Sequence, residues 1–269
     1  MNVVAPLPRF GTEDGLFVNL RRSFRIWQRH RDVFFRLWKT EVGGIVAEPV
    51  LILLAVGFGL GSYIESVGGR SYREFLAPGL FASYAMFGAV FETTYGTYMR
   101  METHRTFHGI LQTPIGVREL VQGEIMWAAT RSLIHVTALL VIASAIGLIG
   151  SPYAVLALPA AVLAGVMFGS IAMLVTSVVP SISGLNNFFT MFITPMFFFS
   201  GVFFPLDRLP EAIQTVAWFL PLTSVAYLMR SLAFGEFDWS SLRALGIILA
   251  FISVFLPLSI KGMRRRLVK

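Results

Sequence analysis

The chain has 269 residues, of which 55% are hydrophobic and 14% are charged, and its mean hydropathy is +0.71. A soluble domain of this length has too little interior to bury so many apolar side chains, so the composition excludes soluble enzymes and binding modules and indicates an integral membrane protein. The absence of cysteine excludes a disulfide, a thiol nucleophile and a cysteine-ligated metal.

Positive charge is concentrated in residues 1–41, which carry eight Lys or Arg and four acids. No signal peptide is expected, because the first long apolar run begins only after Glu41. At about residues 17–39, aromatic and aliphatic side chains alternate with arginines at roughly helical spacing. This pattern predicts an amphipathic helix lying along the membrane interface. A plain basic anchor with no further role is the alternative.

Six apolar runs are long enough to cross a bilayer, which takes roughly 20 residues of helix. We predict these transmembrane spans at about 43–61, 76–98, 123–149, 153–179, 184–205 and 242–260. The apolar stretch 209–235 contains two prolines, Glu211 and Arg230, so it is expected to form short re-entrant helices covered by protein. The predicted fold is therefore all-α, with a membrane domain at 42–261 and a basic tail at 262–269.

Lysine and arginine divide unequally between the two sides that these spans define. The side with both termini and the 99–122 loop holds 16 Lys or Arg against 6 acids, whereas the opposite side holds 5 against 6. An excess of Lys and Arg marks the cytoplasmic face. We therefore predict that both termini and the loop are cytoplasmic. Anionic lipids suit this charge, so the pI of 10.1 requires no nucleic-acid partner.

The sequence predicts no catalytic, metal or directly bound cofactor site. The phosphate-binding pattern G-x-x-x-x-G-K-[ST] is absent, so the chain is not expected to hydrolyse ATP by itself. His104 and His108 have i, i+4 spacing, but no Glu follows the first histidine and no third ligand stands nearby. His30 is an isolated histidine, typical of a packing or interface residue.

Ionisable side chains inside the predicted spans carry more information. Counting about 1.5 Å per residue, Glu48, Glu92 and Arg131 all lie roughly 9–12 Å inside the cytoplasmic boundary. His135 extends this stripe, one helical turn beyond Arg131 on the same face. Each charge costs a few kcal/mol there unless it is paired or hydrated. The residues are predicted to form either an ion cluster that pins the first three spans or the polar floor of a substrate entrance.

Several stretches carry a family resemblance: AEPVLILLAVGFGLGSYI in the first span, YREFLAPGLFASYAMFGAVFETTYGTYMRM through the second, QTPIGVRELVQGEIMWAATRS after it, and ITPMFFFSGVFFPLDRLPEAIQTVAWFLPLTSVAYLMRSLAFG near the end. The patterns S-G-x-x-F-P-x-x-x-L-P at 200–210 and F-L-P-L-T at 219–223 are specific in combination. Over about residues 20–262 the chain resembles the permease subunits of ABC-2 (type-2) ABC exporters, and within them the nodulation-factor exporter permeases and their bacterial relatives.

The resemblance implies a permease homodimer in a bacterial cytoplasmic (inner) membrane, each copy docking a separate ATPase subunit that binds ATP and magnesium. It implies outward export of lipid-linked glycans, lipo-oligosaccharides or amphipathic drugs. It also implies a cytoplasmic coupling helix at about 103–113, between the second and third spans. The residues expected to contact the ATPase are Glu102, Thr103, His104, Arg105, Thr106, Phe107 and His108.

The resemblance further implies that the 209–235 helices lie before the sixth span, on the outer side. The aromatic side chains there are expected to line an outer exit for an acyl chain, although ordinary lipid-facing aromatics at the interface would look the same. The residues expected at this exit are Phe203, Phe204, Pro205, Trp218 and Phe219.

Two other function classes were weighed against an exporter permease. An ion-coupled secondary transporter needs acids at the membrane midplane and inverted repeats, and neither is found in the sequence. A membrane glycosyl- or acyltransferase needs a catalytic acid, base or nucleophile at the membrane surface. Glu102, His104 and His108 are the only candidates, and no supporting residues accompany them.

Overall fold

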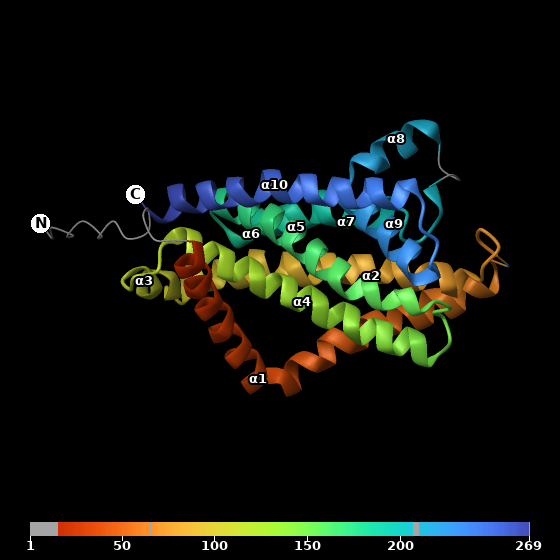
Figure 1. The fold of residues 1–269 in the computed structure, drawn as a ribbon, viewed down its shortest axis with the longest axis horizontal. Helices are drawn as coiled ribbons and strands as arrows, with labels where there is room; N and C mark the ends of the chain where they lie inside the picture. Colours follow the sequence, from red (N-terminus) through yellow and green to blue (C-terminus); the bar gives the residue numbers. More distant parts are fainter. Residues whose placement is uncertain (1–15, 65, 207–209, 269) are drawn as a thin grey trace, which may run out of the picture.

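The computed structural model describes residues 16–64, 66–206 and 210–268, which form an elongated bundle of helices (Figure 1). Six helical segments in these residues are long and apolar enough to cross a membrane. The described chain contains no β-strand, only one isolated bridge between Val67 and Arg70 in the turn after the first span. The predicted all-α class and the six candidate spans are confirmed.

Most spans are built from more than one helical element. The elements in chain order are α1 (Leu16–Leu54), the π-helical η1 (Ala55–Gly59), the 3-10 turn η2 (Leu60–Ser62), α2 (Tyr72–Phe91), the π-helical η3 (Glu92–Gly96) and η4 (Met99–Thr103), α3 (Thr106–Leu111), α4 (Val117–Ala145), the 3-10 turn η5 (Pro152–Leu156), α5 (Ala157–Val178), α6 (Ile182–Phe188), the π-helical η6 (Phe189–Ile193), α7 (Thr194–Phe199), α8 (Glu211–Phe219), α9 (Pro221–Phe234) and α10 (Trp239–Leu267). The second span is thus α2, η3 and η4 in succession, and the fifth is α6, η6 and α7.

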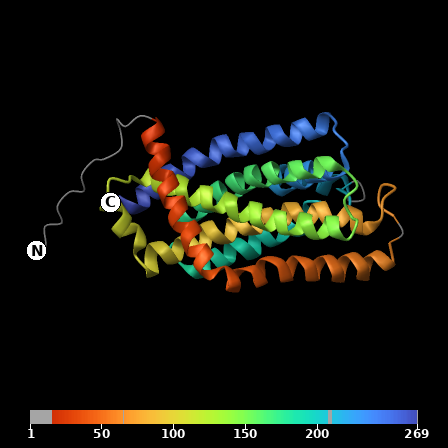
Figure 2. The same ribbon diagram turned by 60° about the horizontal axis from the view of Figure 1, so that its bottom comes forward.

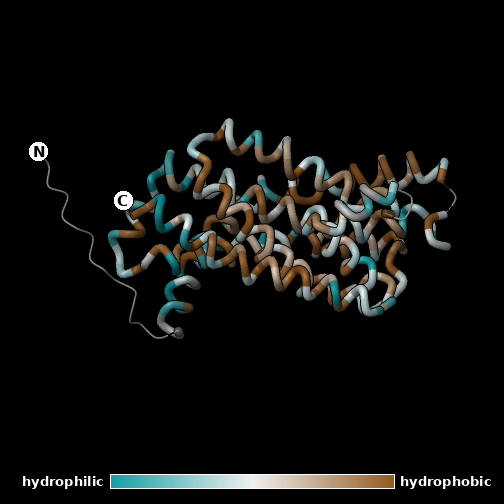
Figure 3. Tube along the Cα trace, turned by 90° about the horizontal axis from the view of Figure 1, so that it is seen from above, coloured by the Kyte–Doolittle hydropathy of each residue, from teal (hydrophilic) through white to brown (hydrophobic). Residues whose placement is uncertain are grey.

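The two ends of the bundle differ in the elements that they hold. The start of α1, the short helix α3 and the last turns of α10 lie together at one end, which we call the α3 end (Figure 1). The opposite end, called the α8 end, holds α8 and the start of α10. Polar residues gather densely at the α3 end, and apolar residues dominate the middle of the bundle (Figure 3).

α1 is a continuous helix with a sharp bend, and its two parts have different surroundings (Figures 1 and 2). The first part crosses the bundle near the α3 end, where it packs on α4, and the second part runs along the bundle as the first span. Ile26 lies in a buried cluster with Leu120 and Val121 of α4. The predicted helix at 17–39 is therefore present, although it is joined to the first span without a break.

α2 is the central helix of the bundle, with α4, α5 and α9 packed around it. Nearly all its side chains are buried, including Leu76, Leu80 and Phe81. Its N-terminus is fixed by a capping box, in which Ser71 accepts from the backbone of Glu74 and Glu74 accepts from the backbone of Ser71. Such a cap satisfies orphan amides at the helix start and contributes about 1 kcal/mol.

Two glycines of α4 and α5 permit close contacts of these helices with their neighbours. A Cβ built on Gly123 of α4 would lie 2.5 Å from Cβ of Ile26, and one built on Gly165 of α5 would lie 2.6 Å from Cα of Ala129. Real Cβ atoms do not approach so closely, so α1 could not pack on α4, nor α5 on α4, with a larger residue at either position. Small residues at helix crossings serve this purpose in membrane proteins generally.

The short helices expected at 209–235 are present as α8 and α9, apart from residue 209, which lies outside the described chain. Leu220 is extended between them, and Thr223 Oγ1 donates to the carbonyl of Ala217 at 2.6 Å, which holds the turn. Arg230 of α9 donates to the carbonyls of Gly201 and Val202 at 2.6 and 3.0 Å. These bonds tie the segment that follows α7 to α9.

The span boundaries differ from the prediction mainly at the α3 end. The expected loop 99–122 begins with η4 (Met99–Thr103), which prolongs the second span, and its last residues belong to α4, which starts at Val117. Only residues 104–116 connect the two spans, and α3 occupies their middle. The predicted boundaries lie where each apolar run ends. The helices themselves continue beyond that point as polar turns, so the predicted spans are too short at this end.

Candidate functional site

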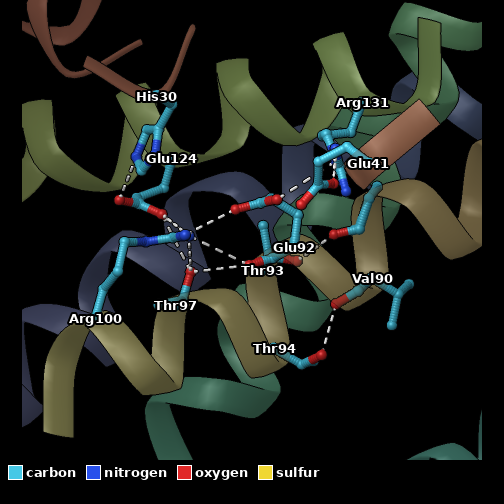
Figure 4. Close-up of polar contacts among 11 residues, drawn as sticks. His30, Glu41, Val90, Glu92, Thr93, Thr94, Thr97, Arg100, Glu124 and Arg131 are labelled. Carbon is cyan, nitrogen blue, oxygen red and sulfur yellow. Dashed lines mark hydrogen bonds and ion pairs between the residues drawn. The ribbon is translucent and has the colours of Figure 1, made fainter. Parts of the chain in front are cut away.

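A chain of six ionisable side chains links α1, the second span and α4 (Figure 4). Along this chain acidic and basic groups alternate, and the separations of neighbouring groups are His30 to Glu124 2.8 Å, Glu124 to Arg100 2.5 Å, Arg100 to Glu92 2.8 Å, Glu92 to Arg131 3.6 Å, and Arg131 to Glu41 2.8 Å. We call these six residues the charged network. It joins helices that are close in space and far apart in sequence.

The middle of the charged network is buried and its far end is partly open. Glu124 is 0% exposed and His30 is 6% exposed, whereas Glu41 is 36% exposed. A buried ion pair stabilises only if its remaining hydrogen-bonding atoms are also satisfied. Here Thr97 Oγ1 donates to Glu124 at 3.3 Å and accepts from Arg100 at 3.4 Å, so a hydroxyl contacts both members of the pair, while Arg100 Nε is buried without a hydrogen-bond partner.

The π-helical turns of the second span position two members of this network. Glu92 begins η3 and Arg100 lies in η4, so both belong to turns wider than an α-helix. Thr93 and Thr94 donate their hydroxyls to the carbonyls of Ala89 and Val90 at 2.8 and 2.6 Å, just where the helix changes pitch. Such π-turns inside helices are frequent at functional sites, because they redirect side chains that a regular helix would aim elsewhere.

Aromatic rings cover the same network on the α1 side. The ring of His30 stacks on Trp127 with centroids 5.9 Å apart, and the guanidinium of Arg131 lies 5.5 Å from the ring centroid of Phe34. Trp27 Nε1 donates to Thr130 Oγ1 at 2.8 Å. The first part of α1 is therefore held to α4 by ion pairs, rings and a hydrogen bond together.

The predicted polar cluster is only partly assembled. Glu92 and Arg131 meet as expected, and His135 lies beside them with Nδ1 2.8 Å from the carbonyl of Arg131. Glu48 does not reach Arg131, because the α1 carboxylate that does so belongs to Glu41. The exposed side chain of Glu48 lies instead beside the hydroxyl of Tyr84, whose ring stacks on His135. The bend in α1 changes the depth of every residue that follows it, which a count along the sequence cannot detect.

The short helix α3 presents polar side chains at the extreme α3 end. Thr103, His104, Arg105 and His108 are exposed around it, whereas Phe107 is 0% exposed in a cluster with Met101 and Leu120. Phe107 therefore anchors α3 to the bundle and is not available to a partner. Arg105 has φ 50°, a left-handed conformation that costs a residue with a Cβ about 1–2 kcal/mol.

Glu102 of η4 connects the α3 region to the last helix. Its carboxylate accepts from Arg266 Nη2 at 2.9 Å, and Nη1 of the same arginine donates to the carbonyl of Val179 at 2.7 Å and to that of Thr176. Arg266 thereby satisfies carbonyls that are left without partners at the end of α5. Of the expected ATPase-contact residues, Glu102 and Phe107 thus also hold the fold, and Thr106 starts α3.

The residues expected at the outer exit lie at the α8 end but do not form one surface. Phe203 packs edge-to-face on Phe197 with centroids 4.9 Å apart, and its carbonyl accepts from Tyr72. Pro205 lines a cavity of about 750 Å³ together with Tyr227 and Arg230. Phe204 is half-buried, the ring of Trp218 lies 6.0 Å from that of Tyr227 in a tilted arrangement, and Phe219 is 78% exposed.

Three members of the charged network, Arg100, Glu124 and Glu41, were not predicted from the sequence, and His30 is not isolated as expected. Glu124 lies only two residues inside the predicted third span, and Arg100 lies in the predicted loop. Both were therefore expected at the membrane boundary, where a charged side chain needs no partner. The available signal was their alternating charge on helices predicted to be neighbours. Among the residues that the structure describes, no group of three or more His, Cys, Asp or Glu could hold a metal ion.

Comparison with known proteins gives consistent matches along most of the chain. The model of the family described as ABC-2 type transporter matches residues 16–234. The chain is 36% identical to Nodulation protein J of Rhizobium leguminosarum bv. trifolii over 91% of this chain and 93% of that protein. It is 37% identical to Nodulation protein J of Sinorhizobium fredii over 76% and 78%, respectively. It is 23% identical to the Inner membrane transport permease YadH of Escherichia coli over 86% and 90%.

Proposed function

From its membership of the ABC-2 type transporter family, we propose that this chain is the membrane subunit of an ATP-driven exporter of amphipathic molecules. Subunits of this family are transmembrane permeases without the ATPase, and an ABC ATPase subunit binds the nucleotide. The chain is accordingly a multi-pass membrane protein and not an enzyme by itself. ATP and magnesium belong to the partner subunit.

We place the α3 end in the cytoplasm of a bacterium, with both termini on that side of the inner membrane. The excess of Lys and Arg in residues 1–41 and 261–269 supports this orientation. One relative is named an inner membrane permease, which agrees with it. In this orientation α8 and α9 lie near the outer surface, where α9 is too short to span the bilayer and acts as a re-entrant helix.

The coupling proposal rests on the contacts that connect α3, through η4, to the charged network. α3 exposes polar side chains for the ATPase, and η4, which precedes it, contains Arg100. Arg100 bonds Glu124 of α4, which in turn bonds His30 in the first part of α1. A displacement of α3 therefore acts on three helices at once, because the ion pairs resist separation in a medium of low dielectric.

The charged network has a second proposed role as the polar wall of a substrate entrance. Its Arg131 and Glu41 end is partly open, while the Glu124 end is closed. An open ion pair near the inner leaflet can accept a polar or charged head group, and the apolar spans around it suit an acyl chain. Lipo-oligosaccharides, lipid-linked glycans and drug-like lipids all have this form, and the relatives named Nodulation protein J favour the first class.

We further propose that two permease copies and two ATPase subunits assemble, with Phe203, Phe204, Pro205, Trp218 and Phe219 near the exit. Exposed aromatic side chains on η6 and α7 support a partner for this face, since Phe192, Phe198 and Phe199 are left uncovered in the single chain. The alternatives of a secondary transporter and a transferase gain no support from the site, which offers neither a midplane acid relay nor a nucleophile.

The deciding experiment is to co-express the chain with its ABC ATPase subunit, purify the pair and identify co-purifying lipids by mass spectrometry. The same preparation is assayed for ATP hydrolysis stimulated by those lipids. We expect stable association and stimulation by a lipid with a sugar-bearing or charged head group. If no ATPase associates and no lipid stimulates hydrolysis, the proposal fails.

Exchanging Glu92 and Arg131 separates the two roles of the charged network. The variant Glu92→Arg with Arg131→Glu keeps one ion pair and reverses its direction. If expression and thermal stability are restored relative to the single variants but transport is not, the entrance role is supported. Restored transport together with restored stability means that the pair is only structural.

A further inference from the structure

A groove of about 700 Å³ lies at the α3 end, between the last turns of α5 and α10. One wall is apolar and consists of Leu174 and Val178 of α5 with Leu258 of α10. The opposite rim is polar and carries Lys261 and Arg265 of α10. The function proposed above does not use this groove, which is separate from the charged network.

The base of the groove is set by a close helix contact. A Cβ built on Gly262 would lie 2.2 Å from Oγ of Ser177, so α10 can approach the end of α5 only because this residue has no side chain. Ser177 Oγ itself donates to the carbonyl of Leu174 at 2.7 Å. The two helices therefore form a firm floor, and the residues before and after Gly262 are held at the groove's edge.

One of the three cations in the lining is already committed within the fold. Arg266 binds Glu102 at 2.9 Å and donates to backbone carbonyls at the end of α5, so its charge is neutralised and its geometry is fixed. Glu102 is the only acid in the lining of the groove. With that pair cancelled, the remaining charge of the groove is positive.

Lys261 and Arg265 supply this remaining charge. They are one helical turn apart on α10 and both are exposed, and neither forms an ion pair within the chain as the structure describes it. The Cβ atoms of residues one helical turn apart are about 5–6 Å apart, so two long cationic side chains at this spacing can converge on one phosphate group. Their aliphatic stems continue the apolar wall, as is usual for Lys and Arg at a bilayer boundary.

We infer that this groove binds the phosphate-bearing head group of an anionic phospholipid, with an acyl chain against Leu174, Val178 and Leu258. The combination of an apolar wall and two uncommitted cations at the end of a span is what such a lipid requires. A zwitterionic head group fits the groove less well, because Lys261 and Arg265 repel its positively charged group. The lipid sits beside Glu102, so it stabilises the junction between η4, α5 and α10.

The test measures lipid retention on the purified permease by native mass spectrometry, with phosphatidylglycerol and phosphatidylcholine offered at equal concentration. We expect phosphatidylglycerol to be retained preferentially on the unaltered chain. The double variant K261Q/R265Q should bind it roughly 25-fold more weakly, at about fivefold per basic residue. R264Q is the matched control, because Arg264 is exposed on the same helix but does not line the groove.

Three results overturn the inference. Equal retention of the two lipids by the unaltered chain shows that the groove does not select charge. Equal loss in R264Q and in K261Q/R265Q shows a diffuse basic surface in place of a site. Normal lipid retention by K261Q/R265Q, with loss of the ATPase subunit on co-purification, assigns these cations to the protein partner.

A second arm distinguishes a lipid from a free anion. Inorganic phosphate and glycerol phosphate are offered as competitors at concentrations up to a hundredfold above the phosphatidylglycerol. We expect little displacement, since neither competitor contacts the apolar wall. Full displacement by inorganic phosphate shows that the groove is a simple anion site and overturns the lipid assignment. Because binding is measured without ATP or transport, this result is independent of the exporter proposal.

Discussion

Arg100 Nη2 lies 2.5 Å from Oε2 of Glu124, and this pair is the centre of the charged network. Each partner has a second contact, Arg100 with Glu92 and Glu124 with His30, so neither charge depends on one bond alone. The pair joins the polar end of the second span to α4 at the point where α1 crosses both. Its energetic role can be separated from its role in transport.

Removing one partner of this pair should destabilise the protein more than removing both. Arg100→Met leaves Glu124 buried with one fewer partner, and breaking a buried pair in this way costs about 3–5 kcal/mol. In the double variant Arg100→Met with Glu124→Leu, neither charge of the pair is left opposite a missing partner, and apolar side chains fill the space. Glu92 keeps Arg131, and His30 loses its carboxylate partner. We expect a large fall in melting temperature for each single variant and a smaller fall for the double variant, measured on purified protein.

The exposed pair Arg31 and Asp32 is the control for this comparison, since its side chains are 39% and 57% exposed. Asp32→Asn should change the free energy of unfolding by no more than about 1 kcal/mol. If the double variant of the buried pair is as unstable as the sum of the single variants, the two charges do not act together.

The left-handed backbone at Arg105 allows its charge to be tested apart from its conformation. Arg105→Gly removes the guanidinium and relieves about 1 kcal/mol of strain, so the melting temperature should be unchanged or higher. If the side chain contacts the ATPase, lipid-stimulated hydrolysis should nevertheless fall at least tenfold. Deletion of residues 103–108 should abolish it while membrane insertion persists.

Arg105→Lys and Arg105→Glu complete this series. Lysine keeps the charge and the strain, and we expect hydrolysis close to that of the unaltered chain. Glutamate reverses the charge and should match the glycine variant in activity without its gain in stability. Full transport by all three variants would mean that this residue is only a connector.

Gly123 should not tolerate a methyl group. Gly123→Ala places a Cβ 2.5 Å from that of Ile26, and overpacking of this kind costs about 1–3 kcal/mol. We expect a lower melting temperature and easier proteolysis of the first part of α1. Gly246→Ala is the matched control, because nothing lies within 4 Å of a Cβ at that helical position. A stability loss of equal size in the control would point to general intolerance of the fold.

Arg230 should control the order of the segment after α7. Arg230→Met keeps the length of the side chain and removes the bonds to the carbonyls of Gly201 and Val202. A buried carbonyl that loses its donor costs about 1–3 kcal/mol. We expect faster hydrogen exchange at residues 200–206 with unchanged exchange in α4, which shares no bond with Arg230.

The cap of α10 should weaken in acid. The hydroxyl of Tyr227 and the contacts to Ser241 lower the pKa of Asp238 from 3.8 to about 2. Because the folded-state pKa lies below the ordinary value, the carboxylate contributes to stability fully above about pH 4 and loses this contribution as the pH falls toward 2. Tyr227→Phe should raise the pKa of Asp238, so the difference in melting temperature from the unaltered chain changes below pH 4. Tyr153→Phe, at the same end, should show no such change.

The number and order of the spans could be predicted from the length of the apolar runs alone, because a run of roughly 20 apolar residues is typical of a membrane-spanning helix. The short pair α8 and α9 also followed from sequence, since prolines and charges divide that apolar stretch. The helix α3 was placed within the expected range by family resemblance. Each of these features depends on local sequence, which a single chain records directly.

The charged network could be predicted only in part, for a geometric reason. Depth was counted from assumed span boundaries, yet the second span continues through η4 and α4 starts at Val117, so Arg100 and Glu124 are farther inside the bundle than counted. The bend in α1 brings Glu41 to Arg131, and Glu48 lies beside Tyr84 instead of beside Arg131. Long-range features of this kind depend on helix curvature and π-turns, which apolar periodicity does not encode.

The π-turn η3 lets the second span hold an extra residue without rotating the charged network that lies on both sides of it. A π-turn holds one residue more than the α-helix that it interrupts, and one residue corresponds to about 100° of rotation. Deleting one residue inside η3 would close the turn into a regular helix with little change in the direction of Arg100, whereas deleting one residue between η3 and η4 would turn Arg100 away from Glu124. Natural variation in the short regular stretch between these two turns should therefore favour substitutions over changes of length.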